Sequence, residues 1–186
     1  MKAILGLVLA LFTMSAMSAD SPLTKVIASC EGCHGANSVP VATNIPILSG
    51  QQYYYLYVQL KDYKAGRREN AIMTPMTQNL SKADMKALAE YFSTKPWPNV
   101  DSFPNSELAD MGNSALDAGQ CSQCHSKYKG DSRIPRVAGQ QLDYMIQTMS
   151  DFKNKVRLNS PAKGSLFSSF SDEDLVAMSH YLSGLQ

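Results

Sequence analysis

The chain has 186 residues, of which 44% are hydrophobic and 18% charged, and its formal net charge at pH 7 is +1. Its 17 basic residues are balanced by 16 acidic ones, so no basic excess supports nucleic-acid binding. Residues 20–98 carry eight basic and six acidic residues, whereas residues 99–186 carry eight and ten. This small charge dipole can orient the molecule toward a partner.

The N-terminal segment predicts export. Met1 and Lys2 precede an almost wholly apolar run that extends to Phe12, and small residues follow up to Ala19. This order is typical of a secretory signal peptide, and the run is shorter than the roughly twenty apolar residues that a membrane span needs. We expect cleavage of residues 1–19, release into the periplasm and only peripheral membrane contact. An uncleaved membrane anchor is the alternative.

Two pentapeptides of the pattern C-x-x-C-H, at residues 30–34 and 121–125, use all four cysteines and two of the three histidines. This pattern is the attachment signal of c-type haem, in which both thiols form thioethers and the adjacent histidine can bind the iron. C-x-x-C alone could be a redox dithiol or half a zinc site, but a zinc site would need four converging ligands, and the two clusters lie 91 residues apart, each with its own histidine. Two disulfides would not explain the histidine after both pairs. The sequence therefore predicts two covalently attached haem c groups. The predicted attachment residues are Cys30, Cys33, Cys121 and Cys124, and the predicted iron ligands are His34 and His125.

The remaining elements of the first half are predicted to be helices. A short helix over residues 24–33 ends at the first motif, and residues 51–64 place apolar side chains at helical spacing. A last helix is expected over residues 82–93, with Ser81 as its N-cap and Asp84 near its positive end. Between the halves, residues 95–105 contain three prolines and predict a linker, in which Trp97 is expected to pack at the junction.

The second half repeats this plan. Residues 134–141 match residues 45–52 at an offset of 89, and residues 170–175 match residues 80–85 at an offset of 90. Helices are expected over residues 106–124, 140–153 and 172–182, with Ser171 and Asp174 at the start of the last one. No segment shows convincing strand alternation. We therefore predict an all-α chain of two duplicated domains, at residues 20–94 and 106–186, joined by the linker.

The order of C-x-x-C-H, a loop proline, Gly-Gln, a methionine loop and Leu-Ser-x-x-Asp resembles class I cytochromes c. Its duplication is similar to the dihaem cytochrome c-four family of bacterial periplasms. The resemblance implies two tandem class I cytochrome c domains, and hydrogen bonds from the ligating histidines to the carbonyls of Pro46 and Pro135. It also implies electron transfer between respiratory partners, which would be a membrane quinol-oxidising complex, a terminal oxidase or a periplasmic reductase.

The resemblance also implies a methionine as sixth iron ligand, eight residues before the serine of Leu-Ser. In the first half this position is Met73, with Met76 as competitor. In the second half it is Lys163, and the loop of residues 160–167 has no methionine. Three outcomes are open: Lys163 binds iron as a neutral amine, the iron keeps an open site, or Lys163 is solvated while another group approaches. The second-half methionines at positions 145, 149 and 178 are expected in the core, and His180 is expected to be exposed.

These observations favour an electron carrier rather than an enzyme. Transient redox encounters use small interfaces, which suits a nearly neutral surface. The alternatives are a haem enzyme, either a sulfur-compound dehydrogenase or a peroxidase, and a gas sensor. All of them would use the atypical second haem. The loop around Lys163 has no histidine or glutamate that would serve such chemistry.

Overall fold

The described part of the chain is helical. The computed structural model describes residues 22–100 and 104–186, so the predicted signal peptide lies outside the described residues. Within these ranges the structure has no strand, which confirms the predicted all-α class. No helix in these ranges has the length and apolar character to cross a bilayer. The helices are α1 (Pro22–His34), α2 (Tyr53–Lys64), α3 (Met73–Thr77), α4 (Lys82–Ser93), α5 (Ser106–Ala118), α6 (Cys121–Cys124), α7 (Leu142–Lys153), α8 (Pro161–Phe167) and α9 (Asp172–Ser183).

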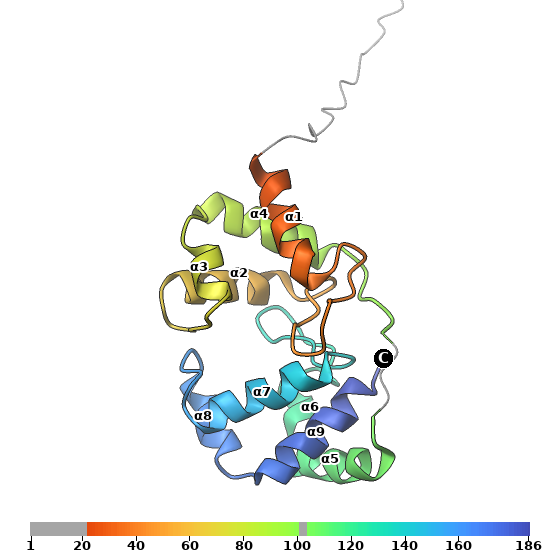
Figure 1. The fold of residues 1–186 in the computed structure, drawn as a ribbon. Coiled ribbons are helices and arrows are strands. Elements are labelled where there is room, and N and C mark those ends of the chain that lie inside the picture. The colour runs from red at the N-terminus through yellow and green to blue at the C-terminus, as the bar shows by residue number, and fades with distance from the viewer. Residues whose placement is uncertain (1–21, 101–103) are drawn as a thin grey trace, which may run out of the picture.

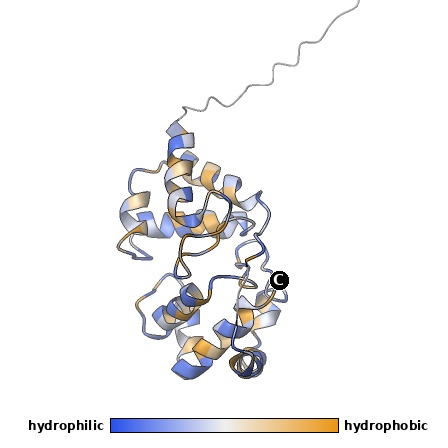
Figure 2. Cartoon of the chain, turned by 45° about the vertical axis from the view of Figure 1, so that its right-hand side comes forward, coloured by the Kyte–Doolittle hydropathy of each residue, from blue (hydrophilic) through white to orange (hydrophobic). Residues whose placement is uncertain are grey.

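The helices form two groups that correspond to the sequence repeat. Figure 1 shows α1–α4 in one half of the molecule and α5–α9 in the other. Since α4 ends at Ser93 and α5 begins at Ser106, the predicted linker falls between the two groups. Figure 2 shows apolar and polar residues interleaved along the helices of both halves. This pattern is expected where each helix turns one face inward and one face to solvent.

The core of the first half lies between α1, α2 and α4. Leu56 of α2 is buried, and its helical neighbours Tyr53, Tyr57 and Leu60 are partly buried against the same cluster. These are the four residues whose spacing predicts the helix, because positions three and four apart share one face. The other buried members of the cluster are Ile27, Leu80, Met85, Leu88, Ala89 and Phe92.

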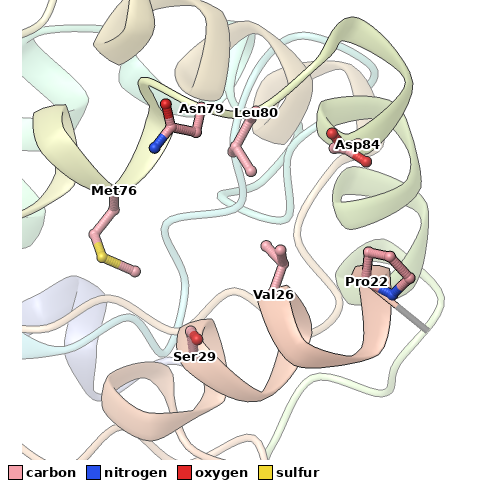
Figure 3. Close-up of a pocket in the computed structure, with 7 residues that line it drawn as sticks. All are labelled: Pro22, Val26, Ser29, Met76, Asn79, Leu80 and Asp84. Atoms are coloured by element: carbon pink, nitrogen blue, oxygen red, sulfur yellow. The ribbon is translucent and has the colours of Figure 1, made fainter. Parts of the chain in front are cut away.

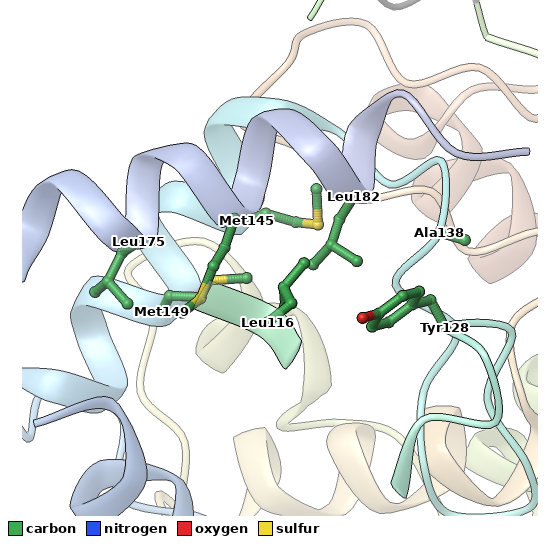
Figure 4. Close-up of a cluster of buried hydrophobic side chains, with 8 residues drawn as sticks. Leu116, Tyr128, Ala138, Met145, Met149, Leu175 and Leu182 are labelled. Carbon is green, nitrogen blue, oxygen red and sulfur yellow. The ribbon is translucent and has the colours of Figure 1, made fainter. Parts of the chain in front are cut away.

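The core of the second half is rich in methionine, as Figure 4 shows. Met145 and Met149 of α7 and Met178 of α9 are all buried in one cluster with Leu175 and Leu182. The prediction that these methionines are core residues is therefore confirmed. An unbranched thioether side chain fills irregular gaps between helices, which explains its use here.

The contact between α5 and α9 depends on Gly112. A Cβ atom at this position would lie 2.1 Å from the carbonyl oxygen of Ala177, inside the backbone of α9. Only glycine allows the two helix backbones to approach this closely. This contact is the most extensive between any two helices of the described chain.

Serine residues begin the last helix of each half, as predicted. The hydroxyl of Ser81 accepts the backbone N–H of Asp84 at 3.1 Å, and the carboxylate of Asp84 accepts the N–H of Ser81 at 2.9 Å. Ser171 and Asp174 form the same capping box at 3.0 and 2.9 Å. Each box satisfies two N–H groups that otherwise have no partner in the first turn. The predicted bounds of α4 are confirmed, and α9 continues one residue further than expected.

The helix predicted over residues 106–124 is interrupted, which corrects the expectation of one continuous helix. α5 ends at Ala118, Gln120 adopts a left-handed backbone with φ 52°, and the motif then forms the separate single turn α6. Glycine costs a helix about 1 kcal/mol relative to alanine, and Gly119 stands at the break. A Cβ there would lie 3.0 Å from the sulfur of Cys121 and 3.1 Å from the ring of Phe170, so the chain turns where only glycine fits easily.

Two short helices were not expected from the sequence. α3 and α8 lie in the loops that carry the candidate sixth ligands. The side chain of Asn70 accepts the backbone N–H groups of Ile72 and Met73 at 3.0 and 2.9 Å where α3 begins. α8 begins with Pro161, whose fixed backbone angle suits a first helical position. Both start signals are present in the sequence, but helices of five and seven residues are too short for periodicity to detect.

Trp97 packs at the junction of the two halves, as predicted. The guanidinium of Arg136 lies over its ring at 4.5 Å from the centroid. Gly50 and Gly139 stand at equivalent positions of the repeat, with φ of 71° and 69°. A Cβ on Gly50 would lie 2.7 Å from the Trp97 nitrogen, and one on Gly139 would lie 3.2 Å from its indole nitrogen. Glycine is therefore required at both positions by a left-handed backbone, by Trp97 at Gly50, and by the Leu185 carbonyl at Gly139, where a Cβ would lie 2.8 Å from its oxygen.

Candidate haem-binding site

The first C-x-x-C-H motif occupies the end of α1. Cys30 is partly buried and Cys33 is exposed, and the two lie about one helical turn apart. Burial, with a smaller contribution from Glu31, raises the pKa of the Cys30 thiol to about 11. His34 is buried at the last position of the helix. Its Nδ1 lies 2.8 Å from the carbonyl oxygen of Pro46, which is the partner that the resemblance implies.

The second motif has the same partner in a different local structure. Cys121 and Cys124 form the ends of α6, and His125 follows directly. The Nδ1 of His125 lies 3.0 Å from the carbonyl oxygen of Pro135. The three residues after His125 have positive φ angles of 50°, 53° and 69°, so the chain turns sharply away from the motif.

These contacts leave one ring nitrogen of each histidine free to bind a metal. A carbonyl oxygen only accepts, so the ring nitrogen that faces it carries the proton, and the Nε2 atom keeps its lone pair. Burial lowers the pKa of His34, against the raising influence of the Pro46 carbonyl. Burial also lowers the pKa of His125, and the charge of Lys163 adds to this effect, against the Pro135 carbonyl. Each ring is thus favoured in the neutral state that a metal requires.

The methionine loop of the first half brings two thioethers to one short helix. Met73 is partly buried at the first position of α3, and Met76 is 46% exposed. Met76 lines a hollow of about 330 Å³ together with Val26 and Leu80. Figure 3 shows its side chain extending from α3 toward α1, the helix that ends in the first motif. Both candidate ligands therefore lie on α3, a helix of the first half of the molecule.

Lys163 is partly buried on α8, and its amino group lies 5.3 Å from the centre of the Phe152 ring. Burial, followed by the nearby charge of Arg157, lowers the pKa of Lys163 to about 8. Lys163 and His125 are 38 residues apart in the chain, and the charge of Lys163 contributes to the lowered pKa of His125.

His180 is not a further candidate ligand. It is partly buried rather than exposed, which corrects the expectation from the sequence. Its Nδ1 accepts the backbone N–H of Asn105 at 3.2 Å, so the side chain is engaged where α9 passes the start of α5. The four cysteines are unbridged in the structure. Among the described residues no three His, Cys, Asp or Glu side chains gather into a metal site.

Two buried arginines that were not expected from the sequence lie between the halves. Arg68 is 9% exposed and donates to the hydroxyl of Tyr144 at 3.2 Å, whereas Arg157 is 6% exposed and donates to the hydroxyl of Tyr55 at 3.4 Å. Both also donate to Gln59 at 2.9 Å. These pairs obey the repeat, since Arg157 and Tyr144 follow Arg68 and Tyr55 by 89 residues. The repeat was the signal that could have found them.

The arginine pair, Arg68 and Arg157, lacks an acidic partner among the described residues. The ion pairs within these ranges are Arg67 with Asp62, Lys95 with Glu31 and Lys153 with Asp172. A buried charge is costly unless an opposite charge compensates it. Although burial raises the pKa of Tyr144, the two guanidinium groups lower it below the usual value of a tyrosine. The interface is therefore strongly positive and suited to a buried anionic group.

The donor set fits a haem c in each half. The cysteines of each half supply two thiols one turn apart, the histidine supplies an Nε2 atom with a free lone pair, and the arginine pair can compensate two of the four carboxylates that two haems carry. Sulfur or amine ligands are available for the sixth position from α3 and α8.

Comparison with known proteins agrees with this chemistry. Residues 24–95 match the cytochrome c family. Cytochrome c4 of Thiocapsa roseopersicina is 34% identical over 170 residues, covering 84% of this chain and 86% of that protein. A thiosulfate dehydrogenase electron acceptor of Stutzerimonas stutzeri strain A1501 is 26% identical, covering 97% of this chain and 93% of that protein.

A solved structure supports the same assignment. The crystal structure of reduced recombinant cytochrome c4 from Pseudomonas stutzeri superposes with a TM-score of 0.79 at 29% identity, covering 92% of this chain and all of that one. The predicted architecture of two tandem class I cytochrome c domains is thereby confirmed. The chain belongs to the cytochrome c4 family, which consists of electron-carrying c-type cytochromes with covalently bound haem.

Proposed function

We propose that this protein is a periplasmic electron carrier with two haem c groups, one in each domain of residues 20–94 and 106–186. The observation that carries this proposal is the histidine geometry, which is the same in both halves. His34 and His125 each direct Nδ1 at a proline carbonyl and leave Nε2 for a metal. A bound haem c supplies a one-electron iron couple, and the residues of the chain hold it, orient it and set its potential.

The residues that would hold each haem follow from the two motifs. Cys30 and Cys33 would carry the first group and Cys121 and Cys124 the second, each through two thioethers. The proximal ligands would be His34 and His125. The arginine pair would compensate haem carboxylates at the interface of the halves, because no acidic side chain of the described chain forms an ion pair with either guanidinium.

The sixth ligands would differ between the halves. Met73 would bind the first iron, and a thioether opposite histidine raises the potential. Lys163 would bind the second iron through its amine, since it is partly buried rather than fully solvated and its charge contributes to the lowered pKa of His125. The first haem would therefore be the high-potential centre, and the second would receive or store electrons at lower potential.

The partners would be other redox proteins. The name of the Stutzerimonas relative points to one class, an enzyme that oxidises thiosulfate and passes electrons on. A membrane quinol-oxidising complex, a terminal oxidase or a periplasmic reductase would serve as the other partner. Export by residues 1–19 would place the mature chain in the compartment where these encounters occur. Neither nucleic acid nor a membrane span enters this function.

The assignment of Met73 is tested by Met73→Ala in the haem-loaded full chain, with Met76→Ala as the matched control. Loss of the thioether should abolish the weak methionine–iron charge-transfer band of the oxidised protein and lower one of two midpoint potentials. Met76→Ala should preserve both. If the band disappears in the control and survives in Met73→Ala, Met76 is the ligand.

The assignment of Lys163 is tested by Lys163→Met. Ligation of the iron by Lys163 and its presence as a nearby cation predict shifts of opposite sign in the second midpoint potential. If the amine binds iron, replacement by a thioether raises the second midpoint potential. If Lys163 is only a nearby cation and the introduced thioether stays off the iron, its loss lowers that potential, because a positive charge favours the reduced iron. A lowered or unchanged potential in a redox titration would contradict ligation by Lys163.

The same protein separates the carrier from the enzyme and sensor alternatives. Cyanide, carbon monoxide and hydrogen peroxide are added to the purified protein while its absorption spectrum is recorded. A carrier with both irons six-coordinate should bind these ligands slowly and show no turnover of peroxide or thiosulfate. Rapid binding at one haem together with turnover would support an enzyme, and rapid binding without turnover would support a gas sensor.

A further inference from the structure

Two buried glutamines cross the interface and reach the peptide units that hold the histidines. The Oε1 atom of Gln140 accepts the N–H of Ile47 at 2.8 Å, and its Nε2 atom donates to the Ile47 carbonyl at 3.1 Å. Gln51 repeats this arrangement in the other direction, because its Oε1 accepts the N–H of Arg136 at 2.8 Å and its Nε2 donates to the Arg136 carbonyl at 2.9 Å. The glutamine of each half thus forms two hydrogen bonds to the residue that follows the loop proline of the other half.

The peptide units involved are those that bind the histidines. The N–H of Ile47 and the carbonyl of Pro46 belong to one amide, so this amide binds Gln140 on one side and His34 on the other. The amide between Pro135 and Arg136 binds Gln51 and His125 in the same way. A continuous chain of hydrogen bonds therefore runs from a glutamine of one half to the histidine of the other half.

Each chain of hydrogen bonds from a glutamine to the opposite histidine, here named a relay, starts at a buried glutamine that is held in a single orientation. Gln51 is 3% exposed, Gln140 5% and Ile47 1%, so water does not compete for these groups. The Oε1 of Gln140 also accepts the backbone N–H of Gln141 at 2.9 Å, and the Oε1 of Gln51 accepts that of Gln52 at 3.0 Å. These second bonds fix each side-chain oxygen toward the interface. The relay is thus a defined structure rather than one of many rotamers.

Hydrogen bonds in such a chain strengthen one another. An amide whose N–H is engaged becomes a better acceptor at its carbonyl, by about 10–30% per bond. A stronger bond at Nδ1 makes the imidazole a stronger electron donor to a metal at Nε2. A stronger donor stabilises the oxidised, more positive iron.

We propose that Gln140 and Gln51 are positioning residues that act across the interface: each strengthens the histidine–carbonyl bond of the opposite half and lowers the reduction potential of the haem held there. This inference rests on the proposed haem ligation by His34 and His125. It makes the potential of each haem a property of both halves.

The test is a pair of redox titrations on the haem-loaded full chain, with Gln140→Met and Gln51→Met. Methionine keeps the side-chain length and removes the acceptor. Gln140→Met should raise only the potential of the haem beside His34, and Gln51→Met only that of the haem beside His125. The reduction equilibrium constant should rise about two- to fourfold, from a 10–30% change in a charge-assisted bond. With about 59 mV per tenfold change, this shift is about 18–36 mV.

A second readout reports the bond itself. In the reduced protein the proton resonance of His34 Nδ1 should move upfield in Gln140→Met, while that of His125 stays in place. Gln52→Met is the matched control, since Gln52 also crosses the interface, to the Lys129 carbonyl at 3.3 Å, but touches neither proline amide. It should leave both potentials and both resonances unchanged.

Several results would overturn the inference. These are equal shifts of both haems in one variant, a shift in the half that carries the substitution, no shift, or a shift in the control. If the methionine variants do not accumulate, Gln140→Ala removes the acceptor without adding bulk, and the His34 proton should then move upfield; a downfield or absent shift refutes the relay. Fewer than two haems per wild-type chain would instead refute the proposed function, so the two failures remain distinguishable.

Discussion

Replacing Arg68 by methionine tests whether the interface holds a buried anion. Arg68 is buried, donates to Gln59 and Tyr144, and forms no ion pair with an acidic residue of the described chain. If a haem carboxylate is its counter-charge, Arg68→Met leaves that carboxylate buried and unpaired. The free energy of unfolding should then fall by about 3–5 kcal/mol. If no anion is present, removal of an uncompensated buried cation should be neutral or stabilising.

The assay is urea unfolding of the haem-loaded protein, followed by circular dichroism and by haem absorption. Tyr144→Phe removes the acceptor of one Arg68 hydrogen bond and keeps the charge, so it should cost only about 1 kcal/mol. Arg133→Met makes the same substitution at an exposed arginine and should change stability by at most about 0.5 kcal/mol. An Arg68→Met protein as stable as the wild type, or more stable, would refute the assignment of a buried counter-anion.

Two further predictions concern stability. Burial raises the pKa of Glu31, but hydrogen bonds from Lys95 and Tyr91 outweigh it and lower that pKa. A carboxyl with a lowered folded pKa stabilises above its unfolded pKa and loses this contribution as the pH falls. Glu31→Gln should therefore cost up to about 1 kcal/mol at pH 7 and nothing well below about pH 4, and a cost independent of pH would contradict this account. Gly112→Ala should destabilise by about 1–3 kcal/mol, because its Cβ would overlap the backbone of α9. Ser114→Ala on the exposed side of α5 should have little effect. If Gly112→Ala and Ser114→Ala unfold at the same temperature, the α5–α9 contact accommodates the added Cβ without loss of stability.

Much of the fold could be predicted because its signals are local. Apolar residues three and four apart define α2 and α7, and Ser81 and Ser171 begin α4 and α9 with capping boxes. The C-x-x-C-H motifs likewise contain cysteines and histidine within five consecutive residues. The short helices α3 and α8 were not predicted because one or two turns do not establish a period. α5 ends earlier than predicted, because Gly119 permits more than one backbone path.

The sequence by itself determined the helical class, the duplication, and the two C-x-x-C-H motifs that we propose attach haem. Each of these depends on residues that are close together in the chain or repeated at a constant offset. Only the tertiary structure decided that Arg68 meets Tyr144, and that Gln140 binds the amide after Pro46, across the interface. The repeat made these positions equivalent, but equivalence does not state whether partners meet within a half or between halves. That choice depends on how two folded halves pack, since hydrogen-bond partners more than 70 residues apart become neighbours only when both cores have formed.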